Sequence, residues 1–152
     1  MKNTFFTLLI FFIGLSSAYS DDHDTEYTLG LGAFASYSTE AEETHPGLHI
    51  HFFKKVIPIL SVGVGYEAIL GDHSQHTAIL LGKVEILQEL YFNFGPGIVF
   101  PIHEDDEFML SGHFELVYLF DVAGMHMGPM IGYVVNEHDS HISGGIHIGF
   151  GF

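Results

Sequence analysis

Hydrophobic and polar residues alternate along the last twelve residues of the chain, HISGGIHIGFGF. The first set, at even positions, comprises Ile142, Ile146, Ile148, Phe150 and Phe152, and the opposite set comprises His141, Ser143 and His147. A period of two is typical of a β-strand with one apolar face. The pattern therefore predicts a strand whose apolar side needs a hydrophobic environment.

Seven earlier stretches alternate in the same way, and turn residues separate them. With the terminal stretch, the eight segments are residues 27–37, 47–56, 60–70, 76–87, 90–100, 108–120, 125–135 and 141–152. Each is close to the ~9–11 residues with which a tilted strand crosses the hydrocarbon layer. The sequence thus predicts an all-β fold, an eight-stranded antiparallel up-and-down transmembrane β-barrel whose apolar face contacts lipid.

The first twenty residues have a different pattern. Lys2 precedes an apolar run from Phe5 to about Leu15, and small residues follow, including Ala18 and Ser20. This arrangement is typical of a secretory signal peptide and is too short for a membrane-spanning helix. We expect residues 1–20 to be a signal peptide cleaved near Ser20 and residues 21–152 to form the barrel.

The connections between the segments fall into a short set and a long set. The short ones are residues 57–59, 88–89 and 121–124, and the long ones are residues 38–46, 71–75, 101–107 and 136–140. Barrels of this kind have short periplasmic turns and longer extracellular loops. We therefore expect the long set to face outward.

The signal peptide, the eight alternating segments and the terminal strand ending at Phe152 together resemble the small eight-stranded outer-membrane barrels of Gram-negative bacteria, the OmpA transmembrane-domain and OmpX-like class. The resemblance implies an integral outer-membrane location, contact with lipopolysaccharide, and insertion by the outer-membrane assembly machinery, which reads the C-terminal strand. The class includes adhesins, structural barrels and a few lipid-modifying enzymes, so the fold alone does not define the function.

The composition of the chain excludes several kinds of partner and site. The chain has a net charge of −15, no arginine and no cysteine, yet its mean hydropathy is +0.31. Nucleic acid is therefore an unlikely partner, and disulfides and thiolate metal sites are excluded. High hydropathy in so acidic a chain fits apolar residues placed at every second position of many strands.

The polar parity predicts a barrel interior rich in ionisable residues: His49, His51, Lys55, Glu67, Lys83, Glu85, Tyr91, Asn93, His113, Glu115, His126, His141, Ser143 and His147. Because buried charges need partners, the histidines complete a hydrogen-bond network in one interpretation. In the other, the pairs His49/His51 and His113/Glu115 begin a site for zinc, copper or nickel. The short turn at residues 57–59 predicts that His49 lies near Glu67.

The long loops carry the more specific hypothesis, because each combines histidine with carboxylates and none contains lysine or arginine. The predicted ligands are His45, His73, His76, His103, Asp105, Asp106, His138, Asp139 and His141. Such loops favour capture of a divalent transition metal, Zn²⁺ or Cu²⁺, at the extracellular rim. Calcium bridging the loop carboxylates to lipopolysaccharide phosphates is a related alternative.

Other functions stay open beside this non-enzymatic prediction. The barrel could be structural or adhesive, with histidines that only pack and solvate. The stretch His141-Ile142-Ser143 looks like the catalytic pair of outer-membrane lipid A deacylases, but Gly144 follows the serine and no acidic residue comes later. In a soluble lipocalin-like barrel, the apolar residues of each segment would face inward and the polar residues would face outward.

Pro96 is unusual within its segment, because proline cannot donate to a strand ladder. We expect a bulge or a missing hydrogen bond near it.

Overall fold

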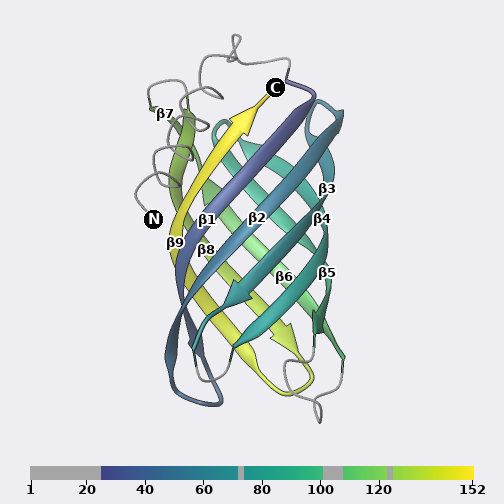
Figure 1. The fold of residues 1–152 in the computed structure, drawn as a ribbon. Coiled ribbons are helices and arrows are strands. Elements are labelled where there is room, and N and C mark those ends of the chain that lie inside the picture. The colour runs from purple at the N-terminus through teal and green to yellow at the C-terminus, as the bar shows by residue number, and fades with distance from the viewer. Residues whose placement is uncertain (1–24, 72–73, 101–107, 123–124) are drawn as a thin grey trace, which may run out of the picture.

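The computed structural model describes residues 25–71, 74–100, 108–122 and 125–152, and the predicted signal peptide lies outside them. The described residues form nine strands (Figure 1): β1 Tyr27–Ser38, β2 Thr44–Ile57, β3 Leu60–Ile69, β4 Gln75–Leu87, β5 Leu90–Phe100, β6 Met109–Tyr118, β7 Phe120–Val122, β8 Met125–Asn136 and β9 Ser140–Gly151. Within this part of the chain, no helix has the length and apolar character that crossing a membrane requires.

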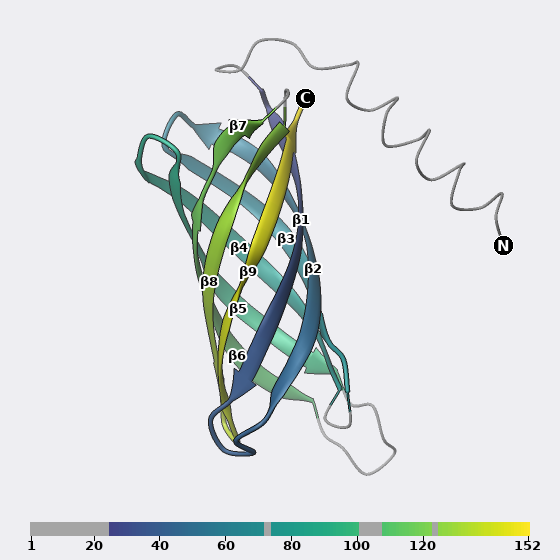
Figure 2. The same ribbon diagram turned by 90° about the vertical axis from the view of Figure 1, so that its left-hand side faces the viewer.

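The strands close into one antiparallel barrel. Each pairs with its neighbour in the chain from β1 to β6, β6 then pairs with β8, β8 with β9, and β9 with β1. The three residues of β7 also pair with β8 and prolong β6 beyond Leu119, so the wall contains eight strand positions. The prediction of a closed eight-stranded antiparallel barrel is confirmed (Figures 1 and 2).

The two ends of the barrel differ in their connections. At one end, called the turn end, residues 58–59 and 88–89 join strands, and Tyr27 lies beside Phe152 with backbone hydrogen bonds of 3.0 and 2.9 Å. The opposite end, called the loop end and drawn at the bottom of Figure 1, carries the connection from Ser38 to Thr44 and that from Asn136 to Ser140. The first loop is shorter than predicted because β2 begins at Thr44.

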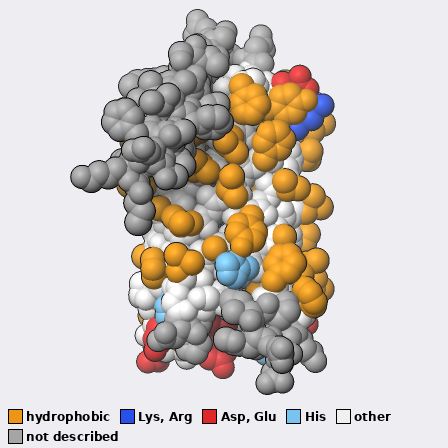
Figure 3. Space-filling view, viewed as in Figure 1, with side chains coloured by type: hydrophobic (Ala, Val, Ile, Leu, Met, Phe, Trp, Pro, Cys, Tyr) orange, Lys and Arg blue, Asp and Glu red, His pale blue; other side chains and the backbone are white. Residues whose placement is uncertain are grey.

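Many large apolar side chains are exposed on the outside of the wall, and Figure 3 shows those on one face. Leu110 is 69% exposed and Leu80 63%, whereas His51 and Glu115, which point inward, are 0% and 1% exposed. Exposed apolar residues outside and buried charged or polar residues inside are the reverse of a soluble barrel. The lipocalin-like alternative is therefore wrong.

The interior is less polar than the alternation predicted. One buried apolar cluster comprises Phe34, Ile69, Val117, Leu119 and Met130, and another comprises Phe53, Ile79 and Leu81. Phe53 shares the parity of His51, and Ile79 and Leu81 share that of Lys83, so the inward parity of β2 and β4 carries apolar as well as polar side chains.

Pro96 interrupts the ladder without shifting it. Strands β4 and β5 pair at Ile79 with Gly97 and at Gly82 with Phe94, and both pairs belong to one register. The two β4 residues between them, 80 and 81, have no ladder partner on β5. The missing pairs confirm the local loss of ladder bonding, and the register shift in this strand pair lies elsewhere, between Glu85 and Leu87.

Candidate metal centre

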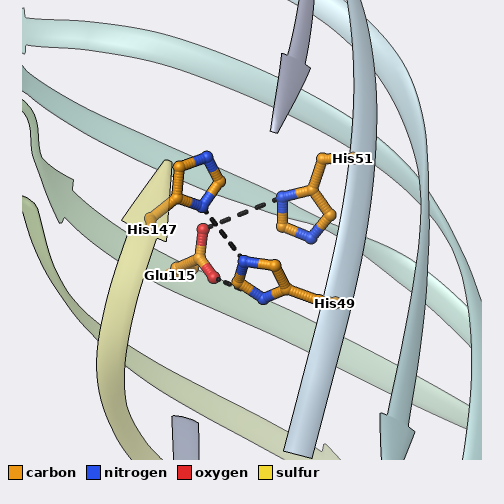
Figure 4. Close-up of side chains that lie close together, drawn as sticks. All are labelled: His49, His51, Glu115 and His147. Atoms are coloured by element: carbon orange, nitrogen blue, oxygen red, sulfur yellow. Dashed lines mark hydrogen bonds and ion pairs between the residues drawn. The ribbon is translucent and has the colours of Figure 1, made fainter. Parts of the chain in front are cut away.

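Four side chains meet inside the barrel: His49 and His51 from β2, Glu115 from β6 and His147 from β9 (Figure 4). Successive residues of a strand point to opposite faces, so the i,i+2 spacing puts both β2 histidines into the interior. One potential ligand atom from each of the four residues lies within 4.8 Å of the others, and all four residues are buried. Of the described residues, these form the one group of three or more potential ligands.

His49 is at the centre of the contacts. Its Nε2 lies 3.0 Å from His147 Nδ1, and its Nδ1 lies 3.3 Å from Glu115 Oε2. The second carboxylate oxygen of Glu115 is 3.9 Å from His51 Nδ1, and the rings of His49 and His51 stack with centroids 4.2 Å apart. Ring nitrogens of all three histidines therefore face a shared space beside the carboxylate.

Glycines provide this space. A Cβ at Gly32 would lie 2.0 Å from His49 Nε2, and one at Gly30 would lie 2.5 Å from His147 Nε2. In the register, Gly32 is opposite His49 on one side and opposite His147 on the other. The two rings meet above Gly32 because that residue has no side chain.

Several polar atoms at the centre are poorly paired: both ring nitrogens of His51 have no hydrogen-bond partner, and His49 Nδ1 and Glu115 Oε2 have the 3.3 Å contact with each other but no further hydrogen bond. Buried polar groups are normally paired, so a cluster of poorly paired acceptors and donors needs an explanation. Asn93 donates a 2.7 Å hydrogen bond to Glu115 Oε1 and thereby orients the carboxylate.

Three imidazoles and one carboxylate are a donor set that suits Zn²⁺, Cu²⁺ or Ni²⁺. The ligand atoms of a tetrahedral zinc site lie about 3.4 Å apart. Since the four donors already lie within 4.8 Å of one another, modest side-chain rotations bring them to that spacing.

A second buried pair lies next to this group. His113 Nδ1 is 3.8 Å from Glu67 Oε2, and the His113 ring meets the His51 ring edge-on with centroids 6.2 Å apart. His49 is directly opposite Glu67 in the ladder, as the turn at residues 57–59 predicted. Histidines therefore do accompany the interior carboxylates, which the hydrogen-bond interpretation also expected.

In the described part of the rim, two of the predicted histidines each lie beside one carboxylate. His45 Nε2 lies 3.3 Å from Glu43 Oε2, and His141 Nε2 lies 3.4 Å from Asp139 Oδ2. His76 contacts the Tyr66 hydroxyl on the outward face, and the His138 backbone amide donates to Asn136 Oδ1. His73, His103, Asp105 and Asp106 lie outside the described residues, so rim capture stays a prediction.

Asp139 organises the described part of the rim. The Ser38 hydroxyl and the backbone amides of Glu40 and Ser140 donate hydrogen bonds to its carboxylate. Partial burial alone would raise the pKa of Asp139, but these hydrogen bonds and nearby His141 hold that pKa below its ordinary value.

The sequence predicted that all four residues of the centre face the interior, but it did not predict that they lie close together. The HxH motif on β2 was visible, whereas the proximity of His147 depends on barrel closure through β1. The useful signal is Gly32, which occupies the position between two histidine-bearing strands. The candidate pair His141 and Ser143 faces the interior, at 6% and 7% exposed.

No protein-family model matches the chain, and no curated protein matches it. Solved structures do. One described as "De novo design of transmembrane beta-barrels" has a TM-score of 0.53 and 16% identity, and the similarity covers 87% of this chain and 99% of that one. The solution NMR structure of the de novo designed TMB2.3 gives a TM-score of 0.47 and 14% identity over 83% and 96%. The chain thus has a fold similar to that of designed transmembrane β-barrels.

Proposed function

We propose that this chain is an integral β-barrel of a Gram-negative outer membrane that binds a divalent transition-metal ion, Zn²⁺ or Cu²⁺, through His49, His51, Glu115 and His147. The observation that carries the proposal is the convergence of these four buried side chains, with both ring nitrogens of His51 lacking a hydrogen-bond partner, in a space that glycines keep open.

The outer surface supports the membrane location. The rings of Tyr27, Phe52 and Phe152 pack together at the turn end, with centroids 5.8 to 6.5 Å apart. Lys54 lies over the Tyr27 ring at 5.5 Å and pairs with Glu26 at 3.2 Å. An aromatic group beside a lysine at the edge of an apolar band is typical of a membrane interface.

The centre is suited to holding an ion. Four protein ligands close a tetrahedral coordination shell, whereas catalytic zinc sites keep one position for water or substrate. Asn93 fixes the Glu115 carboxylate, and the negative charge of that carboxylate offsets part of the charge of the ion. We therefore propose a non-enzymatic role in metal binding, with the rim pairs Glu43/His45 and Asp139/His141 as additional contacts for the cation.

This location implies further partners. The strand β9, which ends beside Phe152, would be read by the outer-membrane assembly machinery, and the loop end would contact lipopolysaccharide. Both assignments rest on the resemblance to small outer-membrane barrels.

The proposal is tested by titrating Zn²⁺ and Cu²⁺ into residues 21–152 refolded in detergent. We expect one high-affinity ion per barrel. His147→Gln should weaken binding by more than the roughly 10- to 100-fold that loss of an outer-shell partner costs, because it removes a direct ligand. His138→Gln is the matched control, since His138 lies in a loop, and it should bind as the parent does.

Two results would overturn the proposal. Absence of binding at micromolar metal would leave a structural or adhesive barrel. Binding that His138→Gln abolishes and His147→Gln leaves intact would move the site to the rim.

A further inference from the structure

We infer that the metal ion reaches the interior centre from the loop end alone, because a layer built around Lys83 closes the turn end to cations. This inference rests on the proposed metal-binding function and assigns Lys83 as the residue that makes access one-sided.

On several strands, the layer consists of the next inward-facing residue after the centre in the direction of the turn end. Phe53 follows His51 on β2, and Val117 follows Glu115 on β6, in each case toward the turn end; both are 2% exposed. On β5, Tyr91 lies two residues nearer the turn end than Asn93. These side chains lie between the ligands and the turn end of the barrel.

Lys83 sits within this layer. Its ammonium is 5.0 Å from the ring centroids of both Phe53 and Tyr91, and the residue is paired in the ladder with Asn93, which holds Glu115. A lysine ammonium near the faces of two aromatic rings is attracted by them. The same charge repels any cation that approaches along this route.

The cavity at the turn end stops at this layer. It has a volume of about 370 Å³, and Lys83, Tyr91 and Leu119 are among its lining residues. None of the four residues of the centre lines it. The carboxylates of Glu85 and Asp121 also line this cavity.

The loop side of the centre is different. On β6, the next inward-facing residue from Glu115 toward the loop end is His113, and Ser111 follows it. On β9, Ser143 and His141 also face inward and lie on the loop side of the centre. Both ring nitrogens of His113 and the Ser111 hydroxyl have no hydrogen-bond partner.

These atoms can replace water around a cation as it moves inward. The His141/Asp139 pair stands at the start of this route and the Glu67/His113 pair stands beside the centre. Apolar side chains such as Phe34 and Ile69 also face inward here, so the route is a line of donors along β6 and β9 and not an open pore.

The test compares rates of Zn²⁺ association with the refolded barrel by stopped flow. Lys83→Met should associate at least about tenfold faster than the parent, because it removes the repelling charge from a second route. Lys83→Arg keeps the charge and should retain the parent rate. Lys54→Met, which removes an exposed lysine at the same end, should also retain it.

A cysteine adduct distinguishes the routes. The chain has no cysteine, so Ser61→Cys, which lines the turn-end cavity, can be labelled selectively with a bulky maleimide. The adduct should leave the parent rate unchanged and should return Lys83→Met to the parent rate. Circular dichroism of each variant confirms that the barrel has folded.

The inference is overturned if Lys83→Met associates at the parent rate or if the Ser61 adduct slows the parent. Either result, obtained with a parent that binds zinc at the interior ligands, leaves the proposed function intact. A parent that binds no zinc refutes the proposed function itself.

Discussion

The Nε2 atom of His49 on β2 lies 3.0 Å from the Nδ1 atom of His147 on β9, although strand β1 lies between these two strands. The contact is possible because the intervening residue is glycine. Ninety-eight positions separate the two histidines in the chain, so their contact depends on the closed barrel.

Gly32→Ala should disrupt this contact. The new Cβ would lie 2.0 Å from His49 Nε2, so the ring must move, and overpacking of this kind costs about 1–3 kcal/mol. Zinc affinity should fall together with the free energy of unfolding, measured by urea titration in lipid vesicles. Gly144→Ala is the control, because its Cβ would meet nothing within 4 Å, and it should leave both quantities unchanged.

Asn93→Ala should weaken zinc binding by about 10- to 100-fold, because the hydrogen bond that orients Glu115 is lost. Isothermal titration measures the change, and circular dichroism checks that the barrel still folds. An affinity equal to that of the parent would show that Glu115 is not a ligand.

Zinc should stabilise the folded barrel. At a free concentration of roughly 100 times Kd, the free energy of unfolding should rise by about 2.7 kcal/mol. The increase should vanish in His147→Gln and persist in His138→Gln. Equal stabilisation of both variants would mean that the ion binds elsewhere.

Charges on the outward face should have costs that depend on depth. Leu80 lies near the middle of β4 and is 63% exposed, whereas His76 lies near the loop end of the same strand on the same face. Leu80→Lys should destabilise the barrel in lipid by about 2–4 kcal/mol, and His76→Lys by about 1 kcal/mol or less. Similar costs at both positions would contradict a membrane-spanning wall.

Asp139 should make stability depend on acid pH. Because the folded-state pKa of Asp139 is lowered, the carboxylate stabilises the fold above its unfolded pKa of about 3.9, and this contribution disappears as pH falls through the folded pKa. Unfolding measured from pH 6 to pH 2 should therefore show a smaller acid loss for Asp139→Asn than for the parent. Glu137→Gln, in the same loop, should follow the parent.

Local patterns were sufficient to predict the wall of the barrel. Alternation identified the strands, and a two-residue connection after Ile57 set the register that brings His49 opposite Glu67. The break at Leu119 was not predictable, because Leu119 continues the apolar pattern of its neighbours. The inward positions of Ile79 and Leu81 follow from the same alternation that placed Lys83 inside, because all three share one parity.

The centre was harder to predict than the wall. Its ligands come from β2, β6 and β9, so its geometry requires every register around the barrel at once. Histidine and carboxylate residues are concentrated in the loop sequences, which favoured the rim, whereas the four interior ligands are scattered among apolar neighbours. Parity identified each as inward-facing, but nothing local shows that they share one height in the barrel.

The backbone hydrogen bonds between Tyr27 and Phe152 join the first strand of the barrel to the last. His147 reaches the other three residues of the centre only when this seam has formed, because β9 comes after the other described strands in the chain and pairs with β1. A chain whose seam is open therefore lacks one of the four residues of the centre. Under the proposed function, metal loading would be a late event that reports completed assembly, and an ion bound at the centre would in turn oppose reopening of the seam.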